Sequence, residues 1–164
     1  MKKVGHAVAV SALLACGVSI GNAEPMKELE VYKGGLGKWM CNAKEVGSGK
    51  TFKAIAEFSV EFDGQTYIER YYEVASADHP SAWKGIFLMS YDAQAQRWVR
   101  NGLDNSGVRN AASSVGWKDN TWVWENDGVN IVITQKGKNN RDFAIDVKDG
   151  GNVKRVVEAN CART

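Results

Sequence analysis

The amino-acid sequence predicts an all-β protein, an up-and-down antiparallel β-barrel of about ten strands preceded by a short helical turn. Two observations point to this fold class. Runs rich in Val, Ile, Trp and Phe follow one another at hairpin spacing, separated by turn pairs such as Asp63-Gly64 and Asp127-Gly128. In addition, Cys41 lies near the start of this pattern and Cys161 near its end. An even number of strands in a meander makes the first and last strands antiparallel, so a disulfide can join them where the barrel closes.

Residues 1–23 have the pattern of a signal peptide. Lys2 and Lys3 form a positive start, residues 7–20 are mostly apolar, and Gly21-Asn22-Ala23 offers small side chains to a signal peptidase. We therefore expect cleavage after Ala23, a barrel domain over 24–164, and a periplasmic or secreted protein. The apolar run is shorter than the roughly 20 residues that a bilayer core requires, so no transmembrane segment is expected.

A second interpretation of this segment stays open. Leu13-Leu14-Ala15-Cys16 resembles a lipoprotein box, and processing there would leave a lipid anchor on Cys16. Either product keeps roughly 140 to 150 residues, enough for one domain with its own core. Either product also keeps Cys41 and Cys161, which in an exported protein most simply form one disulfide.

The charge of the mature chain argues against a nucleic-acid partner. The full sequence carries a formal charge of +2 at pH 7. Lys2 and Lys3 are the charged residues of the expected signal peptide, so its removal leaves a formal charge of zero. A neutral domain lacks the basic surface that binding to phosphates requires.

The elements are expected in a simple order. Residues 25–32 place Met26 and Leu29 on one side of one or two helical turns, which Gly34-Gly35 ends. The clearest strand is 51–62, where apolar residues alternate with mostly polar ones and place one face in the core. Its apolar residues are Phe52, Ala54, Ala56, Phe58, Val60 and Phe62. The full set of expected strands is 38–46, 51–62, 65–75, 84–91, 96–104, 107–117, 120–126, 129–136, 141–148 and 152–162.

The cysteine pair also predicts a register for the seam. If Cys41 faces Cys161 on antiparallel neighbours, Trp39 falls opposite Arg163, because paired positions move in opposite directions by equal steps. A guanidinium then lies against an indole, a favourable stacking or cation–π geometry. We expect Gly37, Trp39 and Arg163 to have structural roles, with Trp39 at the floor of the barrel.

A set of short motifs extends along nearly the whole mature chain. They are Leu29, Tyr32, Leu36, Gly37 and Trp39, then Gly85, Tyr91-Asp92, Arg97-Trp98, Asp104, Gly107 and Gly116. These residues resemble a family of exported or cytoplasmic bacterial lipocalin-like proteins whose function is not established. Calycin barrels such as lipocalins also carry a Trp and an Arg in the relation expected for Trp39 and Arg163. The resemblance implies a calycin-type barrel with an interior cavity and no known reaction, and the cysteine pair is a departure from its pattern.

A polar stretch in the central strands indicates where a ligand could bind. Arg100, Asp104, Asn105, Ser106, Arg109, Asn110, Ser113 and Ser114 stand where a tightly filled barrel would alternate with large apolar residues. We predict that the lumen binds one small amphipathic or acidic molecule, with arginines supplying charge and aromatic rings the walls. The candidate ligand-binding residues are Arg70, Tyr72, Tyr91, Trp98, Arg100 and Arg109. Two alternatives stay open: the polar stretch is solvated at one mouth of the barrel, and a bulge returns Arg70 to solvent.

The sequence favours a binding protein over an enzyme. His79 is the one histidine beyond residue 23, so an ordinary cluster of histidine metal ligands is not expected, and no phosphate-loop or metal motif is present. No cofactor is expected. The alternative function is a periplasmic protein-binding module, such as a hydrolase inhibitor, that acts through its loops and keeps its interior packed. An open lumen with convergent polar groups would favour the small-molecule carrier.

Overall fold

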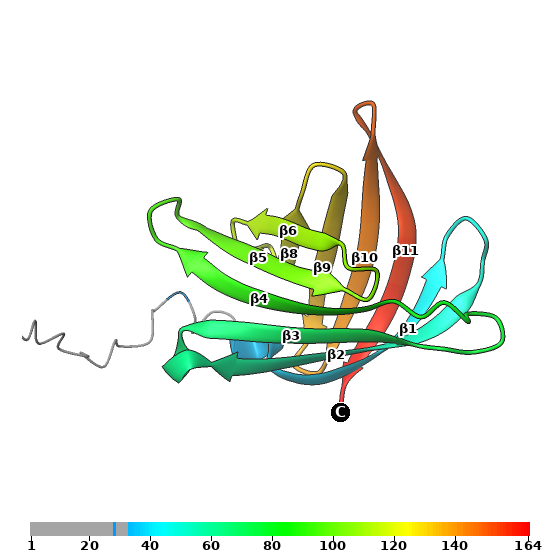
Figure 1. Cartoon of the computed structure of the whole chain (residues 1–164), viewed down its shortest axis with the longest axis horizontal. Helices are drawn as coiled ribbons and strands as arrows, with labels where there is room; N and C mark the ends of the chain where they lie inside the picture. The colour runs from blue at the N-terminus through cyan, green and yellow to red at the C-terminus, as the bar shows by residue number, and fades with distance from the viewer. Residues whose placement is uncertain (1–27, 29–32) are drawn as a thin grey trace, which may run out of the picture.

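Figure 1 shows the computed structural model, which describes Glu28 and residues 33–164. The expected signal peptide over 1–23, the lipid-anchor alternative at Cys16 and most of the expected helical turns over 25–32 lie outside the described residues. Glu28 is helical, and the 3-10 helix η1 (Lys33–Gly35) precedes the first strand. None of the helical segments in the described part has the length and apolar character of a membrane span.

The rest of the described chain is one antiparallel sheet of 11 strands. They are β1 (Gly37–Glu45), β2 (Thr51–Glu61), β3 (Thr66–Val74), β4 (Lys84–Asp92), β5 (Arg97–Asp104), β6 (Arg109–Ser114), β7 (Trp117–Lys118), β8 (Thr121–Glu125), β9 (Val129–Gly137), β10 (Asn140–Asp149) and β11 (Asn152–Arg163). A second 3-10 helix, η2 (Phe62–Gly64), joins β2 to β3. The expected strands are therefore present in the expected order.

The sheet closes into an up-and-down barrel of ten strands. Neighbours in sequence pair with one another from β1 to β6 and from β8 to β11, β1 pairs with β11, and β6 pairs with β8. The β6–β8 contact is a single bridge between Ser113 and Glu125. Strand β7 has two residues, pairs only with β8 as a short hairpin, and is not part of this ring. In Figure 1, β3 to β5 lie across β9 to β11 at a steep angle. The predicted fold class, an all-β antiparallel barrel, is confirmed.

The seam between β1 and β11 has the register that the cysteines require. Cys41 and Cys161 are paired positions and form a disulfide across 120 residues of sequence, which confirms the expected bond. Trp39 pairs with Arg163. The indole Nε1 of Trp39 donates a hydrogen bond of 2.9 Å to the carbonyl of Gly35, and Arg163 donates one from Nη2 to the carbonyl of Gly34. Both seam residues thus hold η1 against this end of the barrel.

Most expected strands differ from the observed ones by one to three residues at their ends, and two of these differences have a clear cause. The expected strand over 107–117 is interrupted after Ser114, where Gly116 adopts a positive φ of 93° outside the usual strand region. Strand β2 ends one residue before Phe62, whose φ of 52° begins η2. The side chain of Phe62 is 68% exposed and that of Val60 is 38% exposed, so the apolar face of β2 stops contributing to the core at Phe58.

The interior is filled at one end, which we call the floor. Trp39, Trp98, Trp122 and Tyr67 are buried there, and Trp122 meets the edges of Trp98 and Trp117 at centroid distances of 5.2 and 5.4 Å. Away from the floor, several inward positions carry small side chains, as in Cys41, Ala43, Ala54, Ala56, Ala112 and Ala159. Small inward side chains leave the other half of the barrel open.

Candidate functional site

The open half of the barrel contains an internal cavity of about 400 Å³, which we call the lumen. Its walls come from nearly every strand of the ring. The apolar lining includes Tyr71, Trp83, Trp124, Ile131, Ile133, Phe143 and Ile145, and the polar lining includes Glu69, Glu73, Arg100, Asn110 and Asn126. A volume in this range is typical of small-molecule sites, in which a few polar groups stand among apolar walls.

A second hollow of about 920 Å³ is larger but has a different character. It is lined mainly by exposed side chains, including Lys44, Lys53, Arg155 and Glu158. These charges are of both signs and belong to long, solvated side chains, which hold a ligand weakly. We therefore regard the smaller, apolar lumen as the candidate site.

Aromatic rings form one continuous wall of the lumen. The Tyr71 ring lies 5.3 Å from Trp83 and 6.4 Å from Phe143, measured between ring centroids, and Trp83 lies 5.8 Å from Phe87. Rings at these separations attract one another beyond the area that they bury. The wall is therefore pre-formed and offers flat apolar surface to a ligand.

A buried ion pair joins β3 to β5 along one wall of the lumen. Arg100 donates from Nε to Oε2 of Glu69 at 2.9 Å, and the two residues are 5% and 8% exposed. The guanidinium carbon of Arg100 lies 3.3 Å above the centroid of the Phe87 ring. Phe87 fits there because Gly102 lacks a side chain: a Cβ on Gly102 would overlap Cδ1 of the Phe87 ring and the carbonyl oxygen of Ile86. The positive charge of Arg100 is thus already balanced by Glu69 and the ring.

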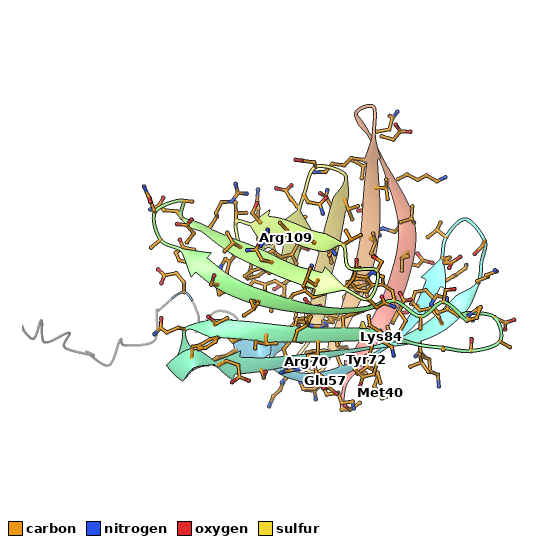
Figure 2. The ribbon with its side chains drawn as sticks, viewed as in Figure 1. Met40, Glu57, Arg70, Tyr72, Lys84 and Arg109 are labelled. Carbon is orange, nitrogen blue, oxygen red and sulfur yellow. A yellow bond between two sulfur atoms is a disulfide. The ribbon has the colours of Figure 1, made fainter. Side chains whose placement is uncertain are left out.

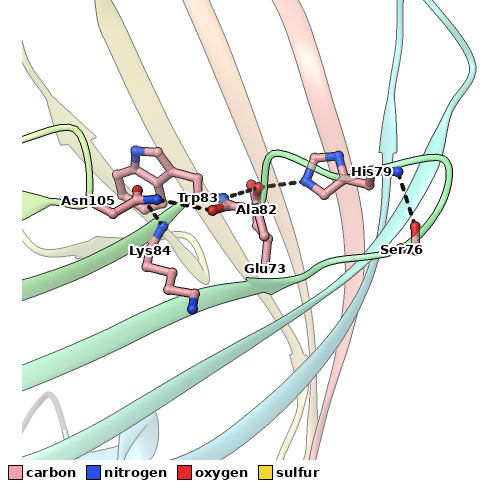
Figure 3. Close-up of polar contacts among 7 residues, drawn as sticks. All are labelled: Glu73, Ser76, His79, Ala82, Trp83, Lys84 and Asn105. Carbon is pink, nitrogen blue, oxygen red and sulfur yellow. Dashed lines mark hydrogen bonds and ion pairs between the residues drawn. The ribbon is translucent and has the colours of Figure 1, made fainter.

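A second carboxylate, that of Glu73, lies at the mouth of the lumen (Figure 3). Its Oε2 accepts a hydrogen bond of 2.8 Å from the backbone N–H of Trp83 and lies 2.7 Å from Nε2 of His79. The His79 ring stacks on Phe52 at a centroid distance of 4.5 Å. These contacts hold the segment 75–83, which we call the strap, beside the mouth. Asn105 fixes its far end by donating to the carbonyl of Ala82 at 3.2 Å.

Between the two carboxylates, the Tyr71 phenol is held in its protonated form. Burial is the main cause that raises the pKa of Tyr71, and the negative charges of Glu73 and Glu69 raise it further. A protonated phenol in an apolar wall both donates and accepts hydrogen bonds. The open half of the barrel therefore combines aromatic surface, one neutral hydroxyl and two carboxylates with a single arginine.

The structure brings together only part of the predicted ligand-binding set. Arg100 lines the lumen, whereas Trp98 lies in the floor with the Tyr91 ring at its edge, 5.8 Å away. Figure 2 shows the other three, Arg70, Tyr72 and Arg109, on the outside of the barrel. Their placement in the lumen is therefore corrected, while a ligand role for Arg100, Tyr91 and Trp98 stays a prediction.

The physical reason for the correction is the unbroken alternation of β3. Tyr67, Glu69, Tyr71 and Glu73 face the interior, so the intervening residues face outward. On that outer face Arg70 donates from Nη1 to Ser59 at 3.4 Å, and the hydroxyl of Tyr72 donates to Glu57 at 3.2 Å. Both faces of β3 carry aromatic and charged residues, so composition did not reveal which one is inside.

The lumen also uses residues that sequence reasoning missed: Glu69, Tyr71, Glu73, Trp83, Phe143 and Ile145. A signal for the first three existed, since they share a face with Tyr67 at every second position of one strand. Trp83 comes from the strap, for which no periodic pattern exists. Among the described residues, no group of three or more His, Cys, Asp or Glu side chains is arranged to hold a metal ion.

Comparisons with known proteins leave the family open. No family model matches the chain, and no curated protein matches it significantly. Solved structures do match, among them a de novo designed fluorescence-activating β-barrel. That chain is 12% identical over 79% of this chain and 93% of its own, with a TM-score of 0.45. The resemblance to lipocalin-like proteins accordingly stays a prediction from the sequence motifs.

Proposed function

We propose that this protein is an exported binding protein that holds one small amphipathic molecule in its lumen. The observation that carries the proposal is the contrast between the two halves of the interior. Large rings fill the floor, whereas in the other half the small side chains of Cys41, Ala56 and Ala112 stand among larger ones and a cavity of about 400 Å³ remains. A barrel needed only as a scaffold would gain stability by filling that space, because unfilled core volume costs free energy.

The lining supports an amphipathic ligand. Tyr71, Trp83 and Phe143 offer apolar surface, while Glu69, Glu73 and Asn126 offer hydrogen-bond acceptors at separate points of the wall. A few polar groups among apolar walls give a ligand both affinity and a fixed orientation. The acidic alternative loses its basis, since Arg70 and Arg109 lie outside and Arg100 is paired with Glu69.

Export is the other part of the proposal, and its support comes from sequence and chemistry together. A disulfide between Cys41 and Cys161 persists in an oxidising compartment and is rare in the cytosol. The pattern of residues 1–23 agrees with this assignment. A protein-binding module acting through its loops would have no use for an open interior, so the loop-mediated alternative is less favoured.

The proposal is tested by binding of indole-sized probes to the purified 24–164 domain. Tryptophol, which has an indole ring and an alcohol, should give a saturable heat of binding in calorimetry and raise the melting temperature. At a hundred times its dissociation constant, a ligand adds about 2.7 kcal/mol of stability. If neither tryptophol nor a panel of aliphatic alcohols gives a heat of binding or changes melting, the carrier function is wrong.

A matched pair of variants locates the binding. Ala112 lines the lumen, and Ser113, its neighbour on β6, has its side chain on the opposite face of the sheet and pairs with Glu125 through the backbone. Ala112→Leu should reduce the volume available to the probe and weaken binding at least several-fold, whereas Ser113→Leu should leave binding unchanged. Equal affinities in Ala112→Leu and the unaltered protein would place the probe elsewhere.

A further inference from the structure

We infer that the lumen selects a positively charged aromatic amine over the carboxylic acid of the same size, with Glu73 as the partner of the amine. This inference rests on the proposed function and deepens it by naming the ligand class. It reverses the charge preference that the arginine-rich central strands suggested. Three observations carry it: the balance of charge in the lumen, the aromatic wall, and the position of Glu73.

The first observation is the balance of charge. The lumen is lined by two carboxylates, Glu69 and Glu73, and by one arginine, Arg100. Because Arg100 donates from Nε to Glu69 at 2.9 Å, an incoming carboxylate would have to displace Glu69 from its buried partner. It would also approach Glu73, and like charges at short distance in a partly desolvated site are strongly unfavourable. An amine meets neither obstacle.

The second observation is the aromatic wall. Tyr71 and Trp83 lie 5.3 Å apart between ring centroids, and Phe143 continues the wall from β10. Their π faces attract cations, most strongly where water is excluded. The molecule already uses this attraction inside the barrel, since the guanidinium of Arg100 lies 3.3 Å from the centroid of Phe87. A protonated amine on an aromatic frame matches both the rings and the carboxylates.

The third observation is that Glu73 is firmly placed. Its Oε2 takes the backbone N–H of Trp83 and the ring nitrogen of His79 on the side of the strap. Its carboxylate also acts on the Tyr71 phenol in the wall. A carboxylate held by donors on one side and facing an apolar cavity is pre-organised to receive a further cation without reorganising. Glu69 is committed to Arg100, which leaves Glu73 as the better partner.

The test uses three probes with one indole frame: tryptamine, tryptophol and indole-3-acetate. Calorimetry on the 24–164 domain at neutral pH should rank the amine first, the alcohol second and the acid last. We expect at least about tenfold between the dissociation constants of amine and acid. If the acid binds as tightly as the amine, or the alcohol binds tightest, the inference is wrong while the proposed function stands. If none of the three binds, the inference is wrong, and the proposed function fails as well if the aliphatic alcohols also do not bind.

Variants then assign the preference to Glu73. Glu73→Gln keeps an acceptor for the Trp83 N–H and removes the charge, so the amine should lose about tenfold in affinity while tryptophol binding changes little. Glu57→Gln is the matched control, because Glu57 lies on the outer face beside Lys38 and Tyr72. An amine preference that survives Glu73→Gln, or that disappears in Glu57→Gln, overturns the assignment. If Glu73→Gln does not fold, the ranking of the three probes in the unaltered protein still decides the inference.

Discussion

The guanidinium carbon of Arg163 lies 4.8 Å from the centroid of the Trp39 ring, and the two residues are register partners across the seam that closes the barrel. A second guanidinium, that of Arg141, lies 4.1 Å from the same ring. Trp39 is fully buried and bonded through its indole N–H to Gly35. The seam residue thus joins β1, β10, β11 and η1 at one point, so its loss should affect the whole floor.

Trp39→Ala should lower the free energy of unfolding by about 3 to 5 kcal/mol, as large truncations in a core do. Arg163→Ala should cost about 1 kcal/mol through the lost stacking and its bond to Gly34. In a Trp39→Ala background, most of the Arg163 effect should vanish, which denaturant titrations of the double-mutant cycle measure. Additive effects would show that the two side chains do not act on each other.

The disulfide should contribute strongly to stability. It closes a loop of 120 residues between Cys41 and Cys161, for which chain entropy gives on the order of 4 to 5 kcal/mol. Reduction, or a Cys41→Ala and Cys161→Ala double variant, should therefore lower the melting temperature clearly. Melting curves with and without reductant check this, and the double variant controls for effects of the reductant itself. Coincident curves would show that hydrogen bonding between β1 and β11 alone holds the seam.

The architecture was predictable because barrels leave strong signals in sequence. Turn pairs separate the strands, and β2 alternates strictly between Phe52 and Phe58. The register followed from Cys41 and Cys161 alone, because in an antiparallel pair one contact fixes all the others. The errors are local and have local causes, such as the positive φ of Gly116 and of Phe62, which end strands that composition would continue.

The site was harder to predict because the alternation of side chains along a strand defines two faces but does not show which face lies inside the barrel. In β3, one face carries Glu69 and Tyr71 and the other carries Arg70 and Tyr72, so both look suited to a polar cavity. Ile68 and Tyr72, which share a face with Arg70, suggest an inward face, but such residues are tolerated outside because much of a protein surface is apolar. Trp83 reaches the lumen from the strap, where tertiary contacts to Glu73, rather than any sequence period, decide the conformation.

Removing one partner of the Glu69–Arg100 pair should destabilise the fold strongly, whereas replacing both partners by apolar residues should destabilise it little. Glu69→Ala leaves a buried arginine without its partner and should lower the free energy of unfolding by about 3 to 5 kcal/mol. The joint change Glu69→Leu with Arg100→Met removes both charges and keeps the volume, so it should cost far less than either single change. Denaturant titrations of Glu69→Ala, of the two single changes and of the joint variant test this. A joint variant as unstable as Glu69→Ala would mean that the pair is needed for more than mutual compensation.

Asp104, in the hairpin between β5 and β6, should contribute to the loss of protein stability at acid pH. The hydroxyl of Ser106 is the main cause that lowers the pKa of Asp104 from its usual 3.8 to about 2, with further donors from Asn110, Ser106 N–H and Val108 N–H. A carboxyl group whose pKa is lower in the folded state stabilises the protein at pH values above its usual pKa. This stability is lost as the pH falls through the pKa of the folded state. Asp104→Asn should therefore flatten the fall in stability between about pH 4 and pH 2. Unfolding midpoints across that range measure it, and parallel curves for both proteins would contradict the prediction.

At alkaline pH the relevant group is Tyr71, whose pKa is raised rather than lowered by folding, so stability is lost as the pH increases. Burial, with the charges of Glu73 and Glu69, raises its pKa above 10.0, so the folded state holds a proton that the unfolded chain releases. The stability that this provides is complete below pH 10 and is lost as pH rises toward the folded value. Tyr71→Phe keeps the ring in the aromatic wall and removes the titrating group, so its unfolding midpoint should fall less steeply above about pH 10.

Tyrosinate absorbance offers an independent readout, because Tyr71 should ionise together with unfolding rather than before it. Equal slopes in both proteins, or full tyrosinate absorbance in the folded state, would show that Tyr71 is not held between the two carboxylates.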